Sequence, residues 1–260
     1  MILRGNFISE ILHMGTNVQV LIPETAREPF RVVYLLHGQH GEQGTWIDYT
    51  MLPYFSKEYN AVFIMPEASR SFYLNFKYGR KYYDYVTDEL PKVCKKIFNI
   101  SAERENTAVM GCSMGGYGSL ILALSKPEQY GFCGAISPAC IYFKHILDTL
   151  KEDPSSYLET GAEAGEIYTD LLSLYGEGLE YKKEYDIIEL IKDFPSASPK
   201  PVIYTTCGTE DNLRDENLRF RDEMKNTEFN YTYEEWSGGH EWYFFNEALK
   251  KTIEFWYSKK

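Results

Sequence analysis

The chain lacks the features that mark several large protein classes. Its 260 residues contain no apolar run long enough to span a membrane, and the N-terminal segment contains no apolar run of signal-peptide length. Basic residues are few relative to acidic ones, 27 against 38, and the formal charge is −11. Phosphate backbones and anionic lipid surfaces attract basic proteins, so the composition argues against nucleic acid and membrane partners.

Cysteine and histidine are equally scarce, with five residues of each. The sequence contains no C-x-x-C pair and no Cys/His cluster with the spacing of a zinc site, so we expect no metal and no cofactor. Cysteines without short paired spacings are typical of reduced thiols, which predicts a cytoplasmic protein.

The rest of the composition is that of an ordinary globular protein, with 44% hydrophobic and 25% charged residues. Strands are expected at 18–22, 32–36, 61–65, 107–110, 133–136, 202–206 and 231–236, and helices at 49–59, 80–98, 114–125, 216–225 and 242–259. This alternation predicts an α/β fold with a mainly parallel central sheet and helices on both faces. The first strands could instead pair antiparallel at one edge, and Pro91 is expected to kink or split its helix.

Residues 141–200 interrupt the alternation. They contain 13 acidic and 6 basic residues and therefore carry −7 of the formal charge. We interpret them as short helices joined by loops with glycine and proline, inserted into a single domain that spans residues 1–260. Two interpretations of this insertion stay open: a solvated helical surface, or a small cap over a binding site.

The motif that indicates chemistry is Gly111-x-Ser113-x-Gly115, which follows a predicted strand and precedes a predicted helix. A serine on a tight strand-to-helix turn sits in strained backbone geometry with its hydroxyl exposed, and small neighbours let the strand and helix approach. The five-residue pattern alone is weak, but in this context it predicts that Ser113 is a nucleophile.

A serine nucleophile needs a histidine base and an acid that orients it, in the chain order serine, acid, histidine. His240 lies in a Gly-rich loop after the last predicted strand, whereas His145 lies in a helical stretch, so His240 is the expected base. Asp211 follows the strand at 202–206 and is the expected acid. Glu210 beside it and Asp215 are the weaker alternatives.

An oxyanion hole needs two backbone N–H donors. One is expected from Met114, which follows the nucleophile. The other is expected from Gln39, in the Gly-rich loop after the strand at 32–36. His37 and His40 in the same loop precede Ser113 in the chain, so we expect them to shape the loop and not to act as the base.

These residues resemble those of the α/β-hydrolase carboxylesterases of the esterase D, tributyrin esterase and feruloyl esterase group. The matching segments run in the same order along nearly the whole chain: Leu35-Leu-His-Gly…Trp46, Ser71-Phe-Tyr…Tyr78-Gly, Glu89-Leu-Pro91, Gly111-Cys-Ser-Met-Gly-Gly116, Cys207-Gly-Thr-Glu-Asp211 and Gly238-Gly-His-Glu-Trp242. The resemblance implies an α/β-hydrolase fold with a triad of Ser113, Asp211 and His240. It is weakest over 141–200, where these enzymes differ in substrate.

The expected function is therefore that of a serine carboxylesterase, a carboxylic ester hydrolase that forms an acyl-enzyme intermediate. The resemblance implies small-molecule substrates with short-chain acyl or hydroxycinnamoyl (feruloyl-type) groups, plant-polysaccharide esters among them. The alternatives are an S-formylglutathione hydrolase-like thioesterase, an acetyl-sugar esterase and, least favoured, a non-catalytic binding module. The sequence leaves the oligomeric state open, so an oligomer is compatible with it.

Aromatic residues make up 16% of the chain, and several fall on the loops that are expected to border the site. Trp46, Tyr73 and Trp242 are the predicted substrate-binding residues among them. Cys112, beside the nucleophile, is interpreted as a small apolar residue packed behind the turn, with a redox-sensitive thiol as the alternative.

Overall fold

The computed structural model describes residues 1–100, 103–153, 155 and 162–259. An eight-stranded sheet with strand order β1-β2-β4-β3-β5-β6-β7-β8 forms its centre. The strands are β1 (Ile2–Ser9), β2 (Met14–Leu21), β3 (Arg31–Leu36), β4 (Ala61–Pro66), β5 (Thr107–Cys112), β6 (Phe132–Ile136), β7 (Val202–Gly208) and β8 (Tyr231–Trp236). From β4 to β8 all neighbouring strands are parallel. The expected α/β-hydrolase architecture is confirmed.

The edge of the sheet formed by β1 and β2 is antiparallel. Strand β2 pairs antiparallel with both β1 and β4, as the alternative pairing of the first strands predicted. Strand β1 was not expected from the sequence. Its residues alternate between exposed and half-buried positions, so it lacks the continuous apolar run that marks the central strands.

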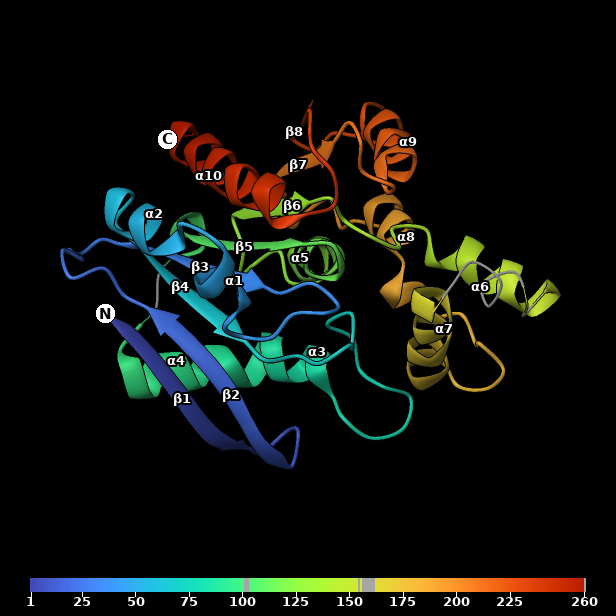
Figure 1. Ribbon diagram of the computed structural model, residues 1–260, viewed down its shortest axis with the longest axis horizontal. Helices are drawn as coiled ribbons and strands as arrows, with labels where there is room; N and C mark the ends of the chain where they lie inside the picture. The colour runs from blue at the N-terminus through green and yellow to red at the C-terminus, as the bar shows by residue number, and fades with distance from the viewer. Residues whose placement is uncertain (101–102, 154, 156–161, 260) are drawn as a thin grey trace.

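Helices cover both faces of the sheet, and they separate into two groups (Figure 1). Helices α1 (Thr45–Tyr49), α2 (Leu52–Glu58) and α10 (Trp242–Ser258) bury their apolar side chains in one hydrophobic core. Helices α4 (Leu90–Phe98), α5 (Met114–Ser125), α8 (Ile187–Lys192) and α9 (Arg214–Met224) contribute to the core on the other face. Strand residues alternate between the two cores. In β3, Val33 and Leu35 face one core while Val32 and Leu36 face the other.

The helical stretch around Pro91 is divided, as the proline predicted. It begins as α3 (Tyr82–Asp84), continues as one π-helical turn (Tyr85–Glu89) and ends as α4. Proline has no N–H to donate back along a helix, which disfavours an unbroken α-helix through this position.

The insertion between β6 and β7 consists of short helices joined by turns and loops in the part that the structure describes. It contains α6 (Phe143–Glu152), α7 (Ala162–Tyr175), a 3₁₀ turn (Lys183–Tyr185) and α8, while residues 154 and 156–161 lie outside the described residues. Helix α8 packs against α5, whereas α6 and α7 lie to the right of the sheet in Figure 1. None of the described helices is both long and apolar enough to cross a membrane.

Candidate active site

Ser113 occupies the turn between β5 and α5 with backbone angles of φ +56° and ψ −120°. This left-handed conformation is unfavourable for a residue other than glycine, and such strain is concentrated at functional sites. A Cβ atom at Gly111 would lie 2.5 Å from the carbonyl oxygen of Gly115, and one at Gly115 would collide with the carbonyl oxygen of Leu36. The glycines are therefore required because the strand and helix approach closely, as the motif predicted.

Asp211 and His240 are hydrogen-bonded to each other across the ends of β7 and β8. The Nδ1 atom of His240 lies 2.9 Å from Oδ2 of Asp211, and Oδ1 of Asp211 accepts a second hydrogen bond from the Leu213 N–H at 2.8 Å. Burial opposes ionisation of the Asp211 carboxyl, but these hydrogen bonds hold its pKa below the ordinary value. The ionised carboxylate fixes the histidine proton on Nδ1 and leaves Nε2 free to accept a proton.

The loop that carries His240 is held against the end of β7. Glu210 accepts a hydrogen bond from the Gly238 N–H, and its own N–H donates to the Gly238 carbonyl at 3.1 Å. Phe245 of α10 packs edge-on against the His240 ring, with 5.0 Å between the ring centroids. Glu210, an alternative acid from the sequence, thus contacts the backbone of the histidine loop, while the imidazole itself bonds to Asp211.

The loop at residues 37–44, called here the oxyanion loop, lies beside Ser113. A Cβ atom built on Gly38 would be 3.6 Å from the Cβ of Ser113. Within the part of the chain that the structure describes, nothing accepts a hydrogen bond from the Gln39 backbone N–H. Met114 begins α5, so its N–H has no acceptor within the helix. Within the described residues, neither predicted donor therefore has an acceptor of its own, which an oxyanion donor requires, and their role stays a prediction.

His37 and Tyr73 stabilise the oxyanion loop through hydrogen bonds. The buried His37 ring accepts a hydrogen bond from the Ala68 N–H at Nε2 (3.1 Å), so its proton lies on Nδ1, which donates to the Gly38 carbonyl (2.8 Å). Burial lowers the pKa of His37 and keeps the ring neutral. The Tyr73 hydroxyl donates to the His37 carbonyl at 2.9 Å. His37 thus shapes the loop, as the sequence predicted.

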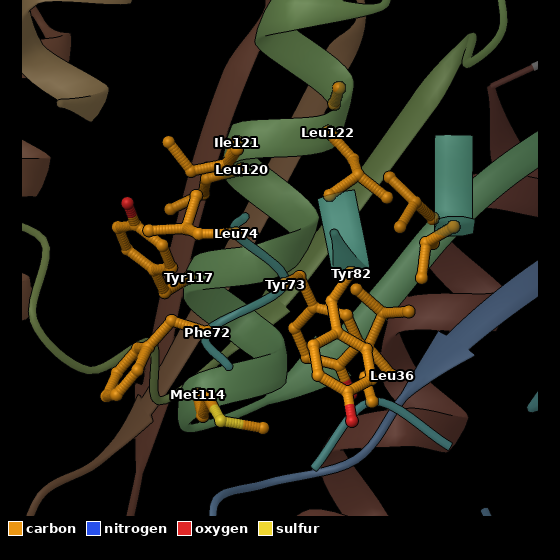
Figure 2. Close-up of a cluster of buried hydrophobic side chains, with 14 of the residues drawn as sticks. Leu36, Phe72, Tyr73, Leu74, Tyr82, Met114, Tyr117, Leu120, Ile121 and Leu122 are labelled. Atoms are coloured by element: carbon orange, nitrogen blue, oxygen red, sulfur yellow. The ribbon is translucent and has the colours of Figure 1, made fainter. Parts of the chain in front are cut away.

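Two of the three predicted substrate-binding residues require correction. Trp46 and Tyr73 are both 0% exposed, so neither offers a surface to a substrate. The Trp46 indole N–H donates to the Leu36 carbonyl at 2.9 Å, while the Tyr73 ring packs beside α5 among the buried side chains of Figure 2. Both side chains instead bind backbone carbonyls at the start of the oxyanion loop, that of Leu36 for Trp46 and that of His37 for Tyr73.

Trp242, the third predicted substrate-binding residue, lines an open surface cavity. This cavity has a volume of about 560 Å³ and lies between the end of α1 and the start of α10. The Trp242 ring stacks on Tyr49 with 5.3 Å between centroids. Trp242 is therefore partly exposed at a cavity whose lining residues do not include Ser113, and its role in substrate binding stays a prediction.

Cys112 is buried directly behind the nucleophile. Burial raises the pKa of its thiol to about 12, which keeps it protonated at neutral pH. A thiolate is the reactive form, so this environment agrees with the packing role and not with a redox-sensitive thiol. The other four cysteines are also free and buried.

Arg70 and Asp170 connect the insertion to the oxyanion loop, and the sequence analysis missed both. The Gln39 side-chain amide donates to Oδ2 of Asp170 on α7 at 2.6 Å, and the guanidinium of Arg70 binds the same carboxylate. The partners Gln39 and Asp170 are 131 residues apart in the chain. No local motif surrounds either residue, so no sequence signal could have identified the pair.

Glu216 provides a prediction about stability. Its carboxylate accepts a long hydrogen bond, 3.4 Å, from the Tyr142 N–H, but burial dominates and raises its pKa to about 7. The unfolded chain ionises Glu216 at its ordinary pKa of 4.5. Between these two values the folded state binds more protons, so stability should fall as the pH rises through this window, by about 3 kcal/mol in total.

Glu216→Gln is therefore expected to increase the free energy of unfolding at pH 8 by about 2–3 kcal/mol and to leave it nearly unchanged at pH 4.5, because the neutral amide removes the cost of ionisation. Urea unfolding of both proteins at the two pH values measures this. An equal difference at both pH values would show that ionisation of Glu216 is not the cause.

The strained serine turn, the hydrogen-bonded acid–histidine pair and the mainly parallel sheet together define the class of a serine hydrolase with the α/β-hydrolase fold. The family follows from a direct comparison: the chain belongs to the Putative esterase family, whose model matches residues 9–255. It is accordingly a carboxylic ester hydrolase.

Individual relatives agree with this placement. The chain is 29% identical to an acetyl esterase of Caldicellulosiruptor saccharolyticus, over 99% of this chain and 98% of the relative. The fluorophosphonate-binding serine hydrolase FphF of Staphylococcus aureus superimposes with a TM-score of 0.84 at 25% identity, and the S-formylglutathione hydrolase FrmB of the same organism with 0.81 at 26%. Each structural match covers 98% of both chains.

Proposed function

We propose that the protein is a serine carboxylesterase in which Ser113 attacks the ester carbonyl. His240 takes the proton of the Ser113 hydroxyl through Nε2 and then donates it to the departing alcohol. The negative charge that develops on the carbonyl oxygen is stabilised by the N–H groups of Gln39 and Met114. A water molecule activated by His240 then attacks the acyl-enzyme, releases the acid and restores Ser113.

The observation that carries this proposal is the hydrogen bond between Asp211 and His240 at the sheet edge where Ser113 lies. Strands β5, β6, β7 and β8 are neighbours and run parallel. Their carboxyl ends therefore meet on one edge, and the serine, acid and histidine each follow one of these strands. Ser113 and His240 come from segments 127 positions apart in sequence that the sheet brings to the same side.

For the substrate, we propose a neutral ester with a short acyl group, of which acetyl is the first candidate. The acetyl esterase of Caldicellulosiruptor saccharolyticus supports this choice. The burial of Trp46 and Tyr73 supports it as well, because the aromatic rings expected to hold a hydroxycinnamoyl group are committed to the core. An acetylated sugar of plant polysaccharide fits the same acyl preference.

The insertion at 141–200 is proposed to act as a small cap beside the site. The contact between Asp170 and Gln39 supports this, because it joins α7 to the loop that carries a proposed oxyanion donor. The segment carries a charge of −7, which disfavours the anionic glutathionyl group of a thioester substrate. A cytoplasmic location is proposed as well, supported by five free and buried cysteines.

A hydrolysis panel tests the proposed specificity. We expect kcat/KM for p-nitrophenyl acetate to equal or exceed that for the butyrate and to exceed that for the octanoate by at least about tenfold, because a small acyl pocket rejects added methylenes. Acetylated xylan should release acetate, while methyl ferulate and S-formylglutathione should be poor substrates. A higher kcat/KM for the octanoate, methyl ferulate or S-formylglutathione would contradict the short-acyl proposal.

A further inference from the structure

Several groups of the oxyanion loop are hydrogen-bonded within the loop or to residues 67–68. His37 bonds to the Ala68 N–H and to the Gly38 carbonyl, and the Gly41 N–H donates to the Gly38 carbonyl at 3.0 Å. Further along, the Gln43 N–H donates to the carboxylate of Glu67 at 3.3 Å. The side chain of Gln39 is instead held by Asp170 of the insertion, and the His40 ring lies 3.5 Å from Glu166 of the same helix.

The group that holds Gln39 is itself rigidly held. Arg70 donates from Nε to both carboxylate oxygens of Asp170, at 3.2 and 3.1 Å, and from Nη2 to Oδ2 at 2.9 Å. Its remaining nitrogen, Nη1, reaches Glu166 one helical turn earlier, at 2.6 Å. The side chains of Asp170 and Arg70 are 12% and 28% exposed, so solvent competes little for these bonds.

We infer that Asp170 is a positioning residue for ester hydrolysis, which acts through the side chain of Gln39 to fix the direction of the Gln39 backbone N–H. This inference rests on the proposed function, since it assigns no new reacting group. A donor in an oxyanion hole is effective only when it points to the place where the oxyanion forms. A bond of 2.6 Å to the same residue's side chain restricts the rotation of that backbone segment.

The charges of Asp170 and Arg70 also affect the energy of a nearby oxyanion. A bare carboxylate near a forming oxyanion would raise the energy of the transition state by like-charge repulsion. Arg70 binds the carboxylate of Asp170 through two nitrogens and so offsets its charge. Arg70 also binds Glu166, so the three side chains keep a net charge of −1, but the carboxylate that accepts from Gln39 is paired directly with a cation.

A kinetic signature follows from this assignment. The oxyanion exists in the transition state and not in the bound ester, so a misdirected donor lowers kcat and leaves KM nearly unchanged. Loss of a whole oxyanion donor costs about 10²–10³-fold in kcat, and a displaced donor should cost less. A structural defect of the insertion would instead change KM or the melting temperature.

The test compares Asp170→Ala, Gln39→Ala and the double variant with p-nitrophenyl acetate as substrate. Gln39→Ala removes the side chain but keeps the backbone N–H. We expect each single variant to lower kcat about tenfold with KM within about twofold. The double variant should also have a kcat about tenfold below that of the wild type, and no lower, because both changes break the same contact. The melting temperature of every variant is measured alongside.

Glu180→Ala is the matched control. Glu180 forms an ion pair of 2.6 Å with Lys77, which also joins the insertion to the segment after β4, but it does not contact the oxyanion loop. Its kcat should stay within about twofold of the wild type. Ser113→Ala serves as the second reference, because a variant that loses the nucleophile reports on the proposed function alone.

The inference is overturned if Asp170→Ala retains kcat within twofold of the wild type, or if the effects of the two single variants multiply in the double variant. An equal loss in Glu180→Ala would overturn it too. If Asp170→Ala fails to fold, Gln39→Ala alone decides by the same criterion. An active Ser113→Ala would instead overturn the proposed function, so the two failures are distinguishable.

Discussion

Replacing Ser113 with alanine is expected to lower kcat for p-nitrophenyl acetate by about 10⁵-fold or more, with little change in stability. The hydroxyl is the only atom group removed, and without it no acyl-enzyme can form. The residual rate would come from the oxyanion donors and from binding alone. Steady-state assays measure the decrease in kcat, and labelling with a fluorophosphonate probe shows whether the nucleophile is present.

Ser125→Ala is a matched control for that change. Ser125 ends the same helix, and its hydroxyl bonds to the Ile121 carbonyl and to Tyr83, far from the turn that carries Ser113. This variant should keep kcat within about twofold and should react with the probe. Labelling of Ser113→Ala, or turnover within a hundredfold of the wild type, would show that another residue is the nucleophile.

Asp211→Asn is expected to lower kcat by about 10⁴-fold while the fold is retained. The carboxylate accepts a hydrogen bond from Nδ1 of His240 and so leaves Nε2 as the proton acceptor. An amide can donate its N–H to Nδ1 instead, which would put the ring proton on Nε2, the tautomer that cannot accept the Ser113 proton. The measurement is kcat at pH 8, together with a thermal unfolding curve.

Asp215→Asn carries the same chemical change four positions away. Asp215 is exposed in the first turn of α9, and the sequence left it as a weaker alternative for the acid. Its replacement should leave kcat within about twofold. If Asp211→Asn kept more than a tenth of the wild-type kcat, or if Asp215→Asn lost as much, the assignment of the acid would be wrong.

The parts of the site that could be predicted from sequence are those encoded by local backbone requirements. Gly111 and Gly115 are needed because strand and helix nearly touch, and that need is visible in five consecutive residues. Asp211 and His240 each follow a strand directly, and the order of parallel strands brings such positions to one edge. Such residues can be recognised from their neighbours in sequence, without knowledge of the tertiary structure.

The parts that could not be predicted depend on packing between distant segments. Trp46 lies on α1 and Tyr73 on the segment after β4, and the rings of both are buried, where each donates a hydrogen bond to a backbone carbonyl. Strand β1 forms because β2 offers it an open edge and not because its own residues are strongly apolar. The bond between Gln39 and Asp170 joins two segments whose approach is set by the whole insertion.

The position of the insertion between β6 and β7 has a consequence for how such enzymes can diversify. These two strands are paired neighbours, and the connection between them contains α8, which packs on α5, and α6, whose Phe143 ring contacts the Tyr117 ring of α5 with 4.8 Å between centroids. Helices α6 and α7 extend that connection, and both bury side chains in the same core as α5, among them Leu147 of α6 and Leu171 of α7. Any replacement of α7, by evolution or by grafting, would therefore need to fill that core and also to present a carboxylate to Arg70 and Gln39, as Asp170 does.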